Sequence, residues 1–264
     1  MRPACSLALL LGSACLPPLV GVVTTQHLLA SLNDPLPGVP ELLAAAAGPE
    51  PAPAAARNRL VLVLLDGVGE SKLRPAVQAG GLGPVAAMVP LDTGTPSLSR
   101  PGYHVVLTGV PAWVSGIRNN PYTTGRADTV ADRVRAAGGQ VAWLLDGVPW
   151  FHELAGRPDE PVGLGQGWSV PAFEAAWASG AALIVVHLAR TDGVAHHLGT
   201  EGDAYREALD AELAHVRALR EVVAASPDRD RSWLLVGSDH GHRPAGGHGG
   251  PEPVVTQVLW TALG

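Results

Sequence analysis

Four short apolar runs constrain the fold of this chain more than any other feature of its sequence. They are rich in Val, Leu and Ile and too short for buried helices, which is typical of buried strands. The runs are Leu60–Leu65, Val141–Leu145, Leu183–Leu188 and Trp233–Val236. A further short strand is expected over Val254–Ala262, at the end of the chain.

Stretches with helical spacing lie between these runs. One begins near Asp128, a candidate cap, and ends at Gly138 and Gly139, while the longest runs from Asp203 to about Ala225. Strands that alternate with helices predict an α/β fold, with a mostly parallel central sheet and helices on both faces in three αβα layers. We expect one domain of this kind over residues 58–264.

The N-terminal part differs in composition from the rest. Arg2 precedes a long uncharged run, so residues 1–25 are interpreted as an export signal or a lipoprotein signal and anchor. Cys15 follows a segment similar to a degenerate lipoprotein site, although a small apolar residue within a signal peptide fits equally well. Residues 26–57 are rich in Ala and Pro and predict a linker. The protein is therefore expected to be exported: periplasmic, secreted or membrane-anchored.

The overall charge bears on the class of partner. The formal net charge is −6 and the calculated pI is about 5.9. Nucleic-acid binding needs a cluster of Lys and Arg on one face, so it is not expected here.

Three of the predicted strands are followed by an aspartate. Asp66 comes directly after the first run, Asp192 follows the third, and Asp239 follows the fourth. A single such aspartate is more often a turn former or a helix cap. Because parallel strands bring their carboxyl ends to one edge, where ligands bind, three together point to a site.

Histidines accompany two of these aspartates. His196 follows Asp192 in DGVAHH, His240 follows Asp239 in SDHGH, and His248 lies in the glycine-rich GGHGG. Carboxylate oxygen and imidazole nitrogen together suit Zn²⁺, whereas Mg²⁺ and Ca²⁺ prefer oxygen alone. The alternative for each pair is a turn aspartate beside a surface histidine.

Ser99 precedes Pro101 and an apolar, helix-like run that leads to Thr108. A serine at the start of a helix has amide donors and a favourable dipole nearby for an anionic substrate. Taken alone, it is better explained as an ordinary N-cap.

In chain order, the motifs VLLDG, SRPGYHVVLTG, DGVAH, SDHG and GGHGG resemble the alkaline phosphatase superfamily. Within it they are most similar to the nucleotide pyrophosphatase and phosphodiesterase branch, over roughly residues 58–262. The resemblance implies a metal-dependent phosphoester hydrolase, either a phosphodiesterase or pyrophosphatase or a phosphatase, with a small-molecule phosphoester substrate.

The resemblance also implies roles for individual residues. Two divalent metal ions are expected, zinc first, and Ser99 would be the nucleophile that forms a phosphoseryl intermediate. Ser97 is the less favoured candidate for this role. One ion would be held by Asp192, His196 and His248, and the other by Asp66, Ser99, Asp239 and His240.

Two departures from related patterns narrow the substrate. Phosphodiesterases of this branch often carry an asparagine where this chain has Gly102, which puts substrate orientation in doubt. Sulfatases of the same architecture have an arginine where this chain has Tyr103, so a phosphate ester is expected rather than a sulfate ester.

Residues after the nucleophile are candidates for substrate contact, with a polar surface loop as the alternative: Arg100, Asn119, Asn120 and Tyr122. Trp150 and Phe151 would either wall a pocket or belong to the core. Two further functions stay open. One is a phosphoryl transferase or mutase of the same superfamily, and the other is a non-catalytic, metal-binding envelope lipoprotein.

Overall fold

The structure is a computed structural model that describes residues 58–121, 127–146, 150–155 and 168–263. The predictions for residues 1–25 and 26–57, including Cys15, and the prediction for Tyr122 lie outside the described residues. Among the described helices, none combines the length and the apolar character needed to cross a bilayer.

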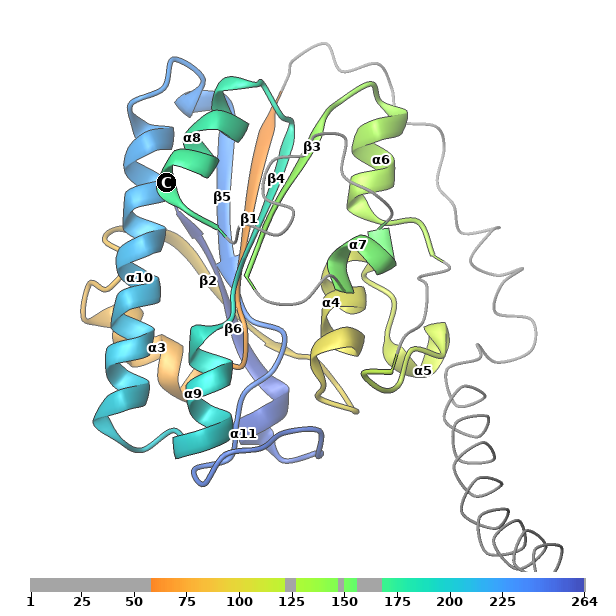
Figure 1. Ribbon diagram of the computed structural model, residues 1–264, viewed down its shortest axis with the longest axis vertical. Coiled ribbons are helices and arrows are strands. Elements are labelled where there is room, and N and C mark those ends of the chain that lie inside the picture. The colour runs from red at the N-terminus through yellow and green to blue at the C-terminus, as the bar shows by residue number, and fades with distance from the viewer. Residues whose placement is uncertain (1–57, 122–126, 147–149, 156–167, 264) are drawn as a thin grey trace, which may run out of the picture.

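The centre of the molecule is a six-stranded sheet with the strand order β2-β6-β5-β1-β4-β3 (Figure 1). The four predicted runs are confirmed as β1 (Arg59–Leu65), β3 (Val141–Leu145), β4 (Leu183–Leu188) and β5 (Ser232–Gly237). These four strands are parallel to one another. The sheet is therefore mostly parallel, as predicted.

The other two strands lie at one side of the sheet. β6 (Gln257–Leu263) is antiparallel to β5 and also pairs with β2 (Val85–Asp92). The predicted strand over 254–262 begins too early, because α11 (Pro253–Thr256) forms a helical turn first. β2 was not predicted, because Pro90 and two alanines within its apolar stretch weigh against a strand, although an exposed edge strand tolerates a proline.

Helices cover both faces of the sheet, which confirms the three-layer prediction (Figure 1). One face is covered by α3 (Glu70–Gln78), α8 (Val170–Ala178), α9 (Arg190–Leu198) and α10 (Asp203–Ala224). The other is covered by α4 (Ser99–Thr108), α5 (Ala112–Ser115), α6 (Val130–Ala136) and α7 (Trp150–Ala155). A short 3₁₀ helix, η1 (Arg229–Arg231), precedes β5.

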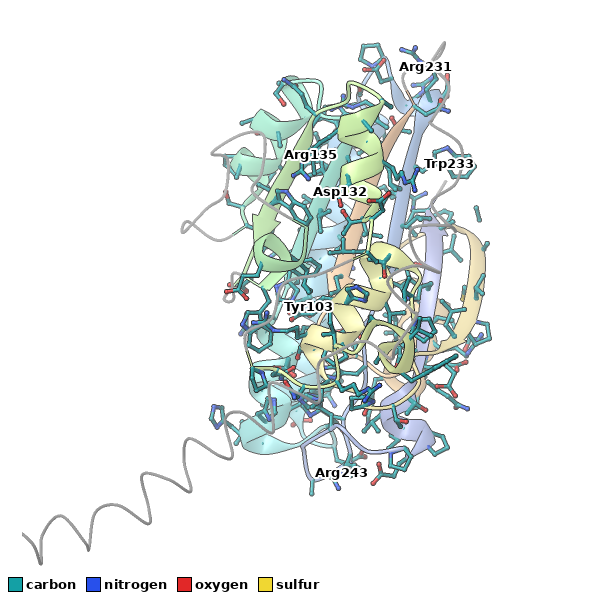
Figure 2. The ribbon with its side chains drawn as sticks, turned by 90° about the vertical axis from the view of Figure 1, so that its right-hand side faces the viewer. Tyr103, Asp132, Arg135, Arg231, Trp233 and Arg243 are labelled. Atoms are coloured by element: carbon teal, nitrogen blue, oxygen red, sulfur yellow. The ribbon has the colours of Figure 1, made fainter. Side chains whose placement is uncertain are left out.

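Alternate residues of β1 supply the two cores. Val61, Val63 and Leu65 belong to the cluster on the α10 side, whereas Leu62 and Leu64 belong to the cluster on the α4 side. A central parallel strand buried on both faces has no polar alternation, which explains the continuous run in the sequence. Figure 2 looks onto the α4 side, where Tyr103 points from α4 toward the sheet.

The two predicted helices differ slightly from expectation. α10 begins at Asp203 as predicted and ends at Ala224. α6 is not capped by Asp128. Thr129 is its N-cap instead, in a capping box with Asp132, while Asp128 forms an ion pair with Arg133.

The order of the central strands determines where functional side chains gather. β1 lies between β5 and β4, and Leu65 at its end pairs with Leu188 at the end of β4. Because the three strands are parallel, the segments that follow them leave from the same edge.

Candidate metal centre

The three predicted aspartates lie together at this edge. Asp66 directly follows β1 and is buried, as is Asp239, which lies just after β5. Asp192 lies in the first turn of α9, which follows β4. Two groups of side chains have ligand atoms close enough to hold a metal ion: Asp192, His196, His242 and His248, and Asp66, Asp192 and His240.

The first cluster joins α9 to the glycine-rich loop. His196 Nε2 lies 3.1 Å from His248 Nε2 and 3.5 Å from Asp192 Oδ1. His248 Nδ1 donates to the carbonyl oxygen of Ser97 at 2.9 Å, so in the neutral ring the lone pair of Nε2 faces the other two groups. Three converging donors of this kind match a catalytic zinc site, which leaves one coordination position open.

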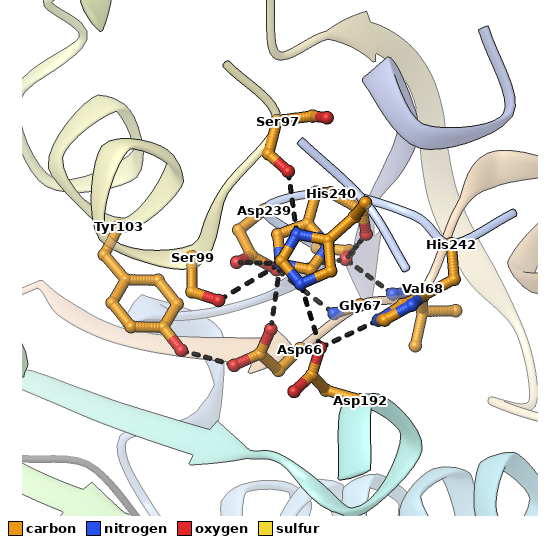
Figure 3. A network of polar contacts seen from close by, with 12 residues as sticks. Asp66, Gly67, Val68, Ser97, Ser99, Tyr103, Asp192, Asp239, His240 and His242 are labelled. Carbon is orange, nitrogen blue, oxygen red and sulfur yellow. Dashed lines mark hydrogen bonds and ion pairs between the residues drawn. The ribbon is translucent and has the colours of Figure 1, made fainter. Parts of the chain in front are cut away.

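The second cluster consists of Asp66, Ser99, Asp239 and His240, of which Asp66 and His240 belong to the second group above (Figure 3). His240 lies at its centre. Its Nε2 lies 3.2 Å from Ser99 Oγ, 3.4 Å from Asp66 Oδ1 and 3.4 Å from Asp239 Oδ2. Ligand atoms around a tetrahedral ion with bonds of about 2.0 Å are separated by roughly 3.3 Å. His240 Nδ1 donates to the carbonyl oxygen of Gly241, which leaves the Nε2 lone pair directed at the oxygens.

Two buried oxygens of the second cluster lack hydrogen bonds. Asp66 Oδ1 and Asp239 Oδ2 have no hydrogen-bond partner among the residues that the structure describes. Buried carboxylate oxygens are normally satisfied, because an unpaired one loses its hydration without compensation. A divalent ion between these oxygens and His240 would satisfy both.

The electrostatics of the second cluster also favour a cation. Burial, together with the charges of Asp66 and Asp192, raises the pKa of Asp239 well above its usual value. Burial lowers the pKa of His240 to about 4, so this ring is neutral at pH 7. Three carboxyl groups beside a neutral imidazole form a site where bound positive charge relieves repulsion.

Asp66 is oriented by two groups that line its other oxygen. Tyr103 donates its hydroxyl hydrogen to Oδ2 (Figure 3). His187 Nε2 lies 2.9 Å from the same atom. Burial raises the pKa of Asp66, but the contacts with His187, His240 and Tyr103 outweigh this and hold it below its usual range. These contacts direct Oδ1 toward the second cluster.

From the sequence, Tyr103 was notable only as the residue that stands where sulfatases have an arginine. Its ring is fully buried and stacks on Phe151, with ring centroids 4.3 Å apart. Phe151 is thus a core residue. A tyrosine within an apolar run gives no sign in the sequence that its hydroxyl will meet Asp66.

His242 is a further residue that sequence reasoning did not place in the ligand set. Its Nδ1 accepts the backbone N–H of Gly247 at 3.1 Å, so the ring proton of the neutral side chain is on Nε2. That Nε2–H donates to Asp192 Oδ1 at 2.8 Å. His242 therefore has no lone pair to offer a metal and instead orients Asp192.

Ser99 is the first residue of α4, and the N-cap is Leu98, which makes no side-chain cap hydrogen bond. The interpretation of Ser99 as an ordinary N-cap is therefore wrong, and its hydroxyl faces His240 instead. Ser97 is used differently. Its hydroxyl donates to the carbonyl of Gly250 and accepts from the N–H of Gly249, which anchors the loop that carries His248.

Gly102, where the phosphodiesterase pattern often has an asparagine, packs closely on Asp239. A Cβ atom at this position would lie 2.8 Å from Asp239 Cβ, closer than carbon atoms approach. The first turn of α4 therefore packs directly on the backbone around Asp239. An asparagine has no room at this position.

A cavity of about 390 Å³ opens above both clusters. Its wall includes Ser99 and candidate ligands of both clusters, together with Trp150, Asp146 and Asn120. Asn120 is one of the four predicted substrate contacts, and its Oδ1 accepts the backbone N–H of Arg100. A polar side chain and an indole thus line the same cavity as Ser99.

The other predicted contacts are placed differently. Arg100 is buried, and its guanidinium forms an ion pair with Glu153 at 2.7 Å and donates to the backbone of Asn120. Neither Arg100 nor Asn119 is among the residues that line the cavity. The described geometry gives Arg100 the role of holding Asn120 in place.

No protein-family model and no curated protein matches the chain. Solved structures do match. A 2-O GAG sulfatase is 11% identical with a TM-score of 0.57, over 79% of this chain and 64% of the sulfatase. The TAB5 alkaline phosphatase is 11% identical with a TM-score of 0.55, over 78% of this chain and 90% of that one.

A third structure is a protein of the alkaline phosphatase superfamily from Vibrio parahaemolyticus. It is 15% identical with a TM-score of 0.52, over 86% of this chain and 68% of that one. The chain spans less than two thirds of the length of the sulfatase and more than two thirds of the other two. At these identities the likeness concerns the fold, and this chain has the fold of the alkaline phosphatase superfamily.

Proposed function

We propose that this protein is a metal-dependent phosphoester hydrolase in which Ser99 is the nucleophile. The observation that carries the proposal is the second cluster, where His240 Nε2 lies 3.2 Å from Ser99 Oγ and 3.4 Å from each of two buried carboxylate oxygens. Among the described residues, these two oxygens have no hydrogen-bond partner. Two structures with this fold are named as a sulfatase and an alkaline phosphatase, which supports an anionic ester as substrate.

Each cluster would hold one divalent ion, and the mixture of carboxylate oxygen and imidazole nitrogen favours zinc. Asp192, His196 and His248 would bind the first ion, and Asp66, Ser99, Asp239 and His240 the second. When bound, such ions supply Lewis acidity that lowers the pKa of a hydroxyl group and offsets the charge of a phosphoryl group.

The side chains of this protein position the reacting groups. Ser99 Oγ would attack phosphorus, so that the Oγ–P bond forms and the bond to the leaving oxygen breaks. The proton of the Ser99 hydroxyl would pass to the leaving oxygen. Water would then attack phosphorus, the Oγ–P bond would break, and one proton of that water would go to Ser99 Oγ. The start of α4 lies beside this serine, where the helix dipole favours an anion.

The charge of the residues that line the cavity helps to distinguish a phosphomonoester substrate from a phosphodiester. Of the described residues that line it, none is Lys or Arg, and Asp146 adds negative charge. A phosphomonoester dianion would lack a cationic side chain here, whereas a diester carries a single negative charge. We therefore favour a diester, with a leaving group that contacts Trp150.

The Ser99→Ala substitution tests the nucleophile. We expect turnover to fall by at least about 10³-fold, because the hydroxyl beside His240 Nε2 is lost, while the nearby hydroxyls of Tyr103 and Ser238 already donate to Asp66 and to the carbonyl of His240. The ion of the first cluster should be retained, which elemental analysis would show. Ser97→Ala is the matched control and should still form a phosphoenzyme with a labelled diester. A Ser99→Ala variant with most of its activity would refute the assignment.

The same assay separates the two rival functions. A phosphoryl transferase would pass the phosphoryl group to an added alcohol in preference to water, which product analysis detects. A non-catalytic metal-binding lipoprotein would contain metal but turn over neither a chromogenic diester nor the matching monoester. Export, and lipidation at Cys15, are part of the proposal and would be tested by mass analysis of the mature protein.

A further inference from the structure

Glu212 is a buried carboxyl group that the proposed reaction does not use. It lies on α10 with 1% of its surface exposed, and it faces the start of α9. Its Oε1 accepts the backbone N–H of Arg190 at 2.8 Å and of Thr191 at 3.2 Å. Glu212 thus satisfies two of the N–H groups that a helix start leaves without partners.

The hydroxyl of Thr191 indicates the protonation state of Glu212. Thr191 Oγ1 lies 2.8 Å from the carbonyl oxygen of Asp66 and 2.8 Å from Glu212 Oε2. A hydroxyl has one hydrogen, and a carbonyl oxygen can only accept, so Thr191 donates to Asp66. The contact with Glu212 is then a hydrogen bond only if Oε2 carries a proton and donates it to Thr191.

We propose that Glu212 is a neutral carboxylic acid that positions the metal centre. It holds the first turn of α9, which carries Asp192, and through Thr191 it ties that turn to the backbone of Asp66. The spacing between the two clusters then depends on this link. This inference rests on the proposed function, because it assigns a positioning role within the same site.

One further observation agrees with a neutral acid at this position, and another agrees with a positioning role for α10. Burial raises the pKa of Glu212 to about 7. From the same helix, Tyr205 donates its hydroxyl hydrogen to the carbonyl of Gly67 at 3.3 Å, so α10 supports the segment after β1 at a second point.

The test compares Glu212→Gln with Glu212→Leu. Glutamine reproduces the neutral acid, because its amide oxygen accepts and its NH₂ donates, while leucine has a similar volume and no polar atoms. We expect Glu212→Gln to keep zinc affinity and kcat within about threefold of the wild type. Glu212→Leu should lose about tenfold or more in zinc affinity, measured by chelator competition, and a similar factor in kcat with little change in KM. Glu207→Leu on the exposed face of α10 is the matched control and should behave as the wild type.

Thr191→Val removes the link to Asp66 while keeping the side-chain shape, and it replaces Glu212→Leu if that variant does not fold. It should also weaken zinc binding about tenfold. If Glu212→Gln loses as much as Glu212→Leu, an ionised carboxylate is required and the proposal is wrong. It is equally wrong if Thr191→Val binds zinc as the wild type does. If the wild type does not turn over phosphoesters, the proposed function is refuted. The role of Glu212 is tested separately, because zinc affinity is measured without turnover.

Discussion

At the scale of single residues, two glycines near the site have opposite surroundings. A Cβ atom at Gly102 would meet Asp239, whereas one at Gly193 in α9 would meet nothing within 4 Å. Gly102→Ala should push α4 away from Asp239 and cost about 1–3 kcal/mol of stability, with a clear loss of kcat. Thermal unfolding and turnover measure the two effects.

Gly193→Ala is the matched control for that substitution. Because alanine suits a helix interior better than glycine, we expect it to raise stability by about 0.5–1 kcal/mol and to keep activity. Wild-type kcat in Gly102→Ala would contradict the close packing between α4 and Asp239.

His242 leads to a prediction about metal affinity rather than metal count. Its Nε2–H donates to Asp192, so His242→Phe should weaken zinc binding at the first cluster about 10–100-fold. At saturating zinc the variant should still bind as many ions as the wild type, because the three ligands of that cluster remain. His196→Ala is the contrasting variant and should lose one ion. Loss of an ion in His242→Phe would show that His242 is a ligand.

At the scale of elements, the contact between α9 and α10 predicts a dependence of stability on pH. The pKa of Glu212 is raised from an ordinary 4.5 to about 7, chiefly by burial, with Asp66 adding to the effect. Between these values the folded state binds more protons than the unfolded state. The free energy of unfolding therefore falls as pH rises through this window, by an amount on the order of 3 kcal/mol.

Glu212→Gln should remove this part of the pH dependence. The free energy of unfolding is measured by urea unfolding of the metal-free wild type and variant at pH 5 and pH 8. The change between the two pH values is calculated for each protein, and the difference between the two changes is the contribution of Glu212. The comparison with the variant is needed because Asp239, whose pKa is also raised, contributes to the pH dependence of stability in both proteins. Equal pH dependence in wild type and variant would show that Glu212 does not titrate in this range.

At the scale of the whole molecule, carboxyl groups from three parts of the chain meet at one edge of the sheet. The raised pKa of Asp239 reflects burial first and then the charges of Asp66 and Asp192. Each bound ion at about one hundred times its dissociation constant adds roughly 2.7 kcal/mol to the stability of the folded state. We expect a chelator to lower Tm by on the order of 10 °C and added zinc to restore it. A Tm that is the same with and without zinc would contradict the metal centre.

Much of the fold could be predicted from local patterns. The runs that form β1 and β4 were predicted because central parallel strands are apolar on both faces, and α10 because one stripe of its residues is buried. β2 could not be predicted in this way. Its pairing with β6 depends on a partner about 170 positions away, and its own residues are mostly exposed.

The candidate site, too, could be predicted only in part from local patterns. The sequence by itself determined which aspartates follow strands and which histidines accompany them, because these are properties of neighbours along the chain. Only the tertiary structure decided that Asp66 is oriented by Tyr103 and that Asp192 is oriented by His242. The same holds for the lack of room at Gly102. These contacts join residues on different elements, and their geometry depends on how strands and helices pack rather than on any local pattern.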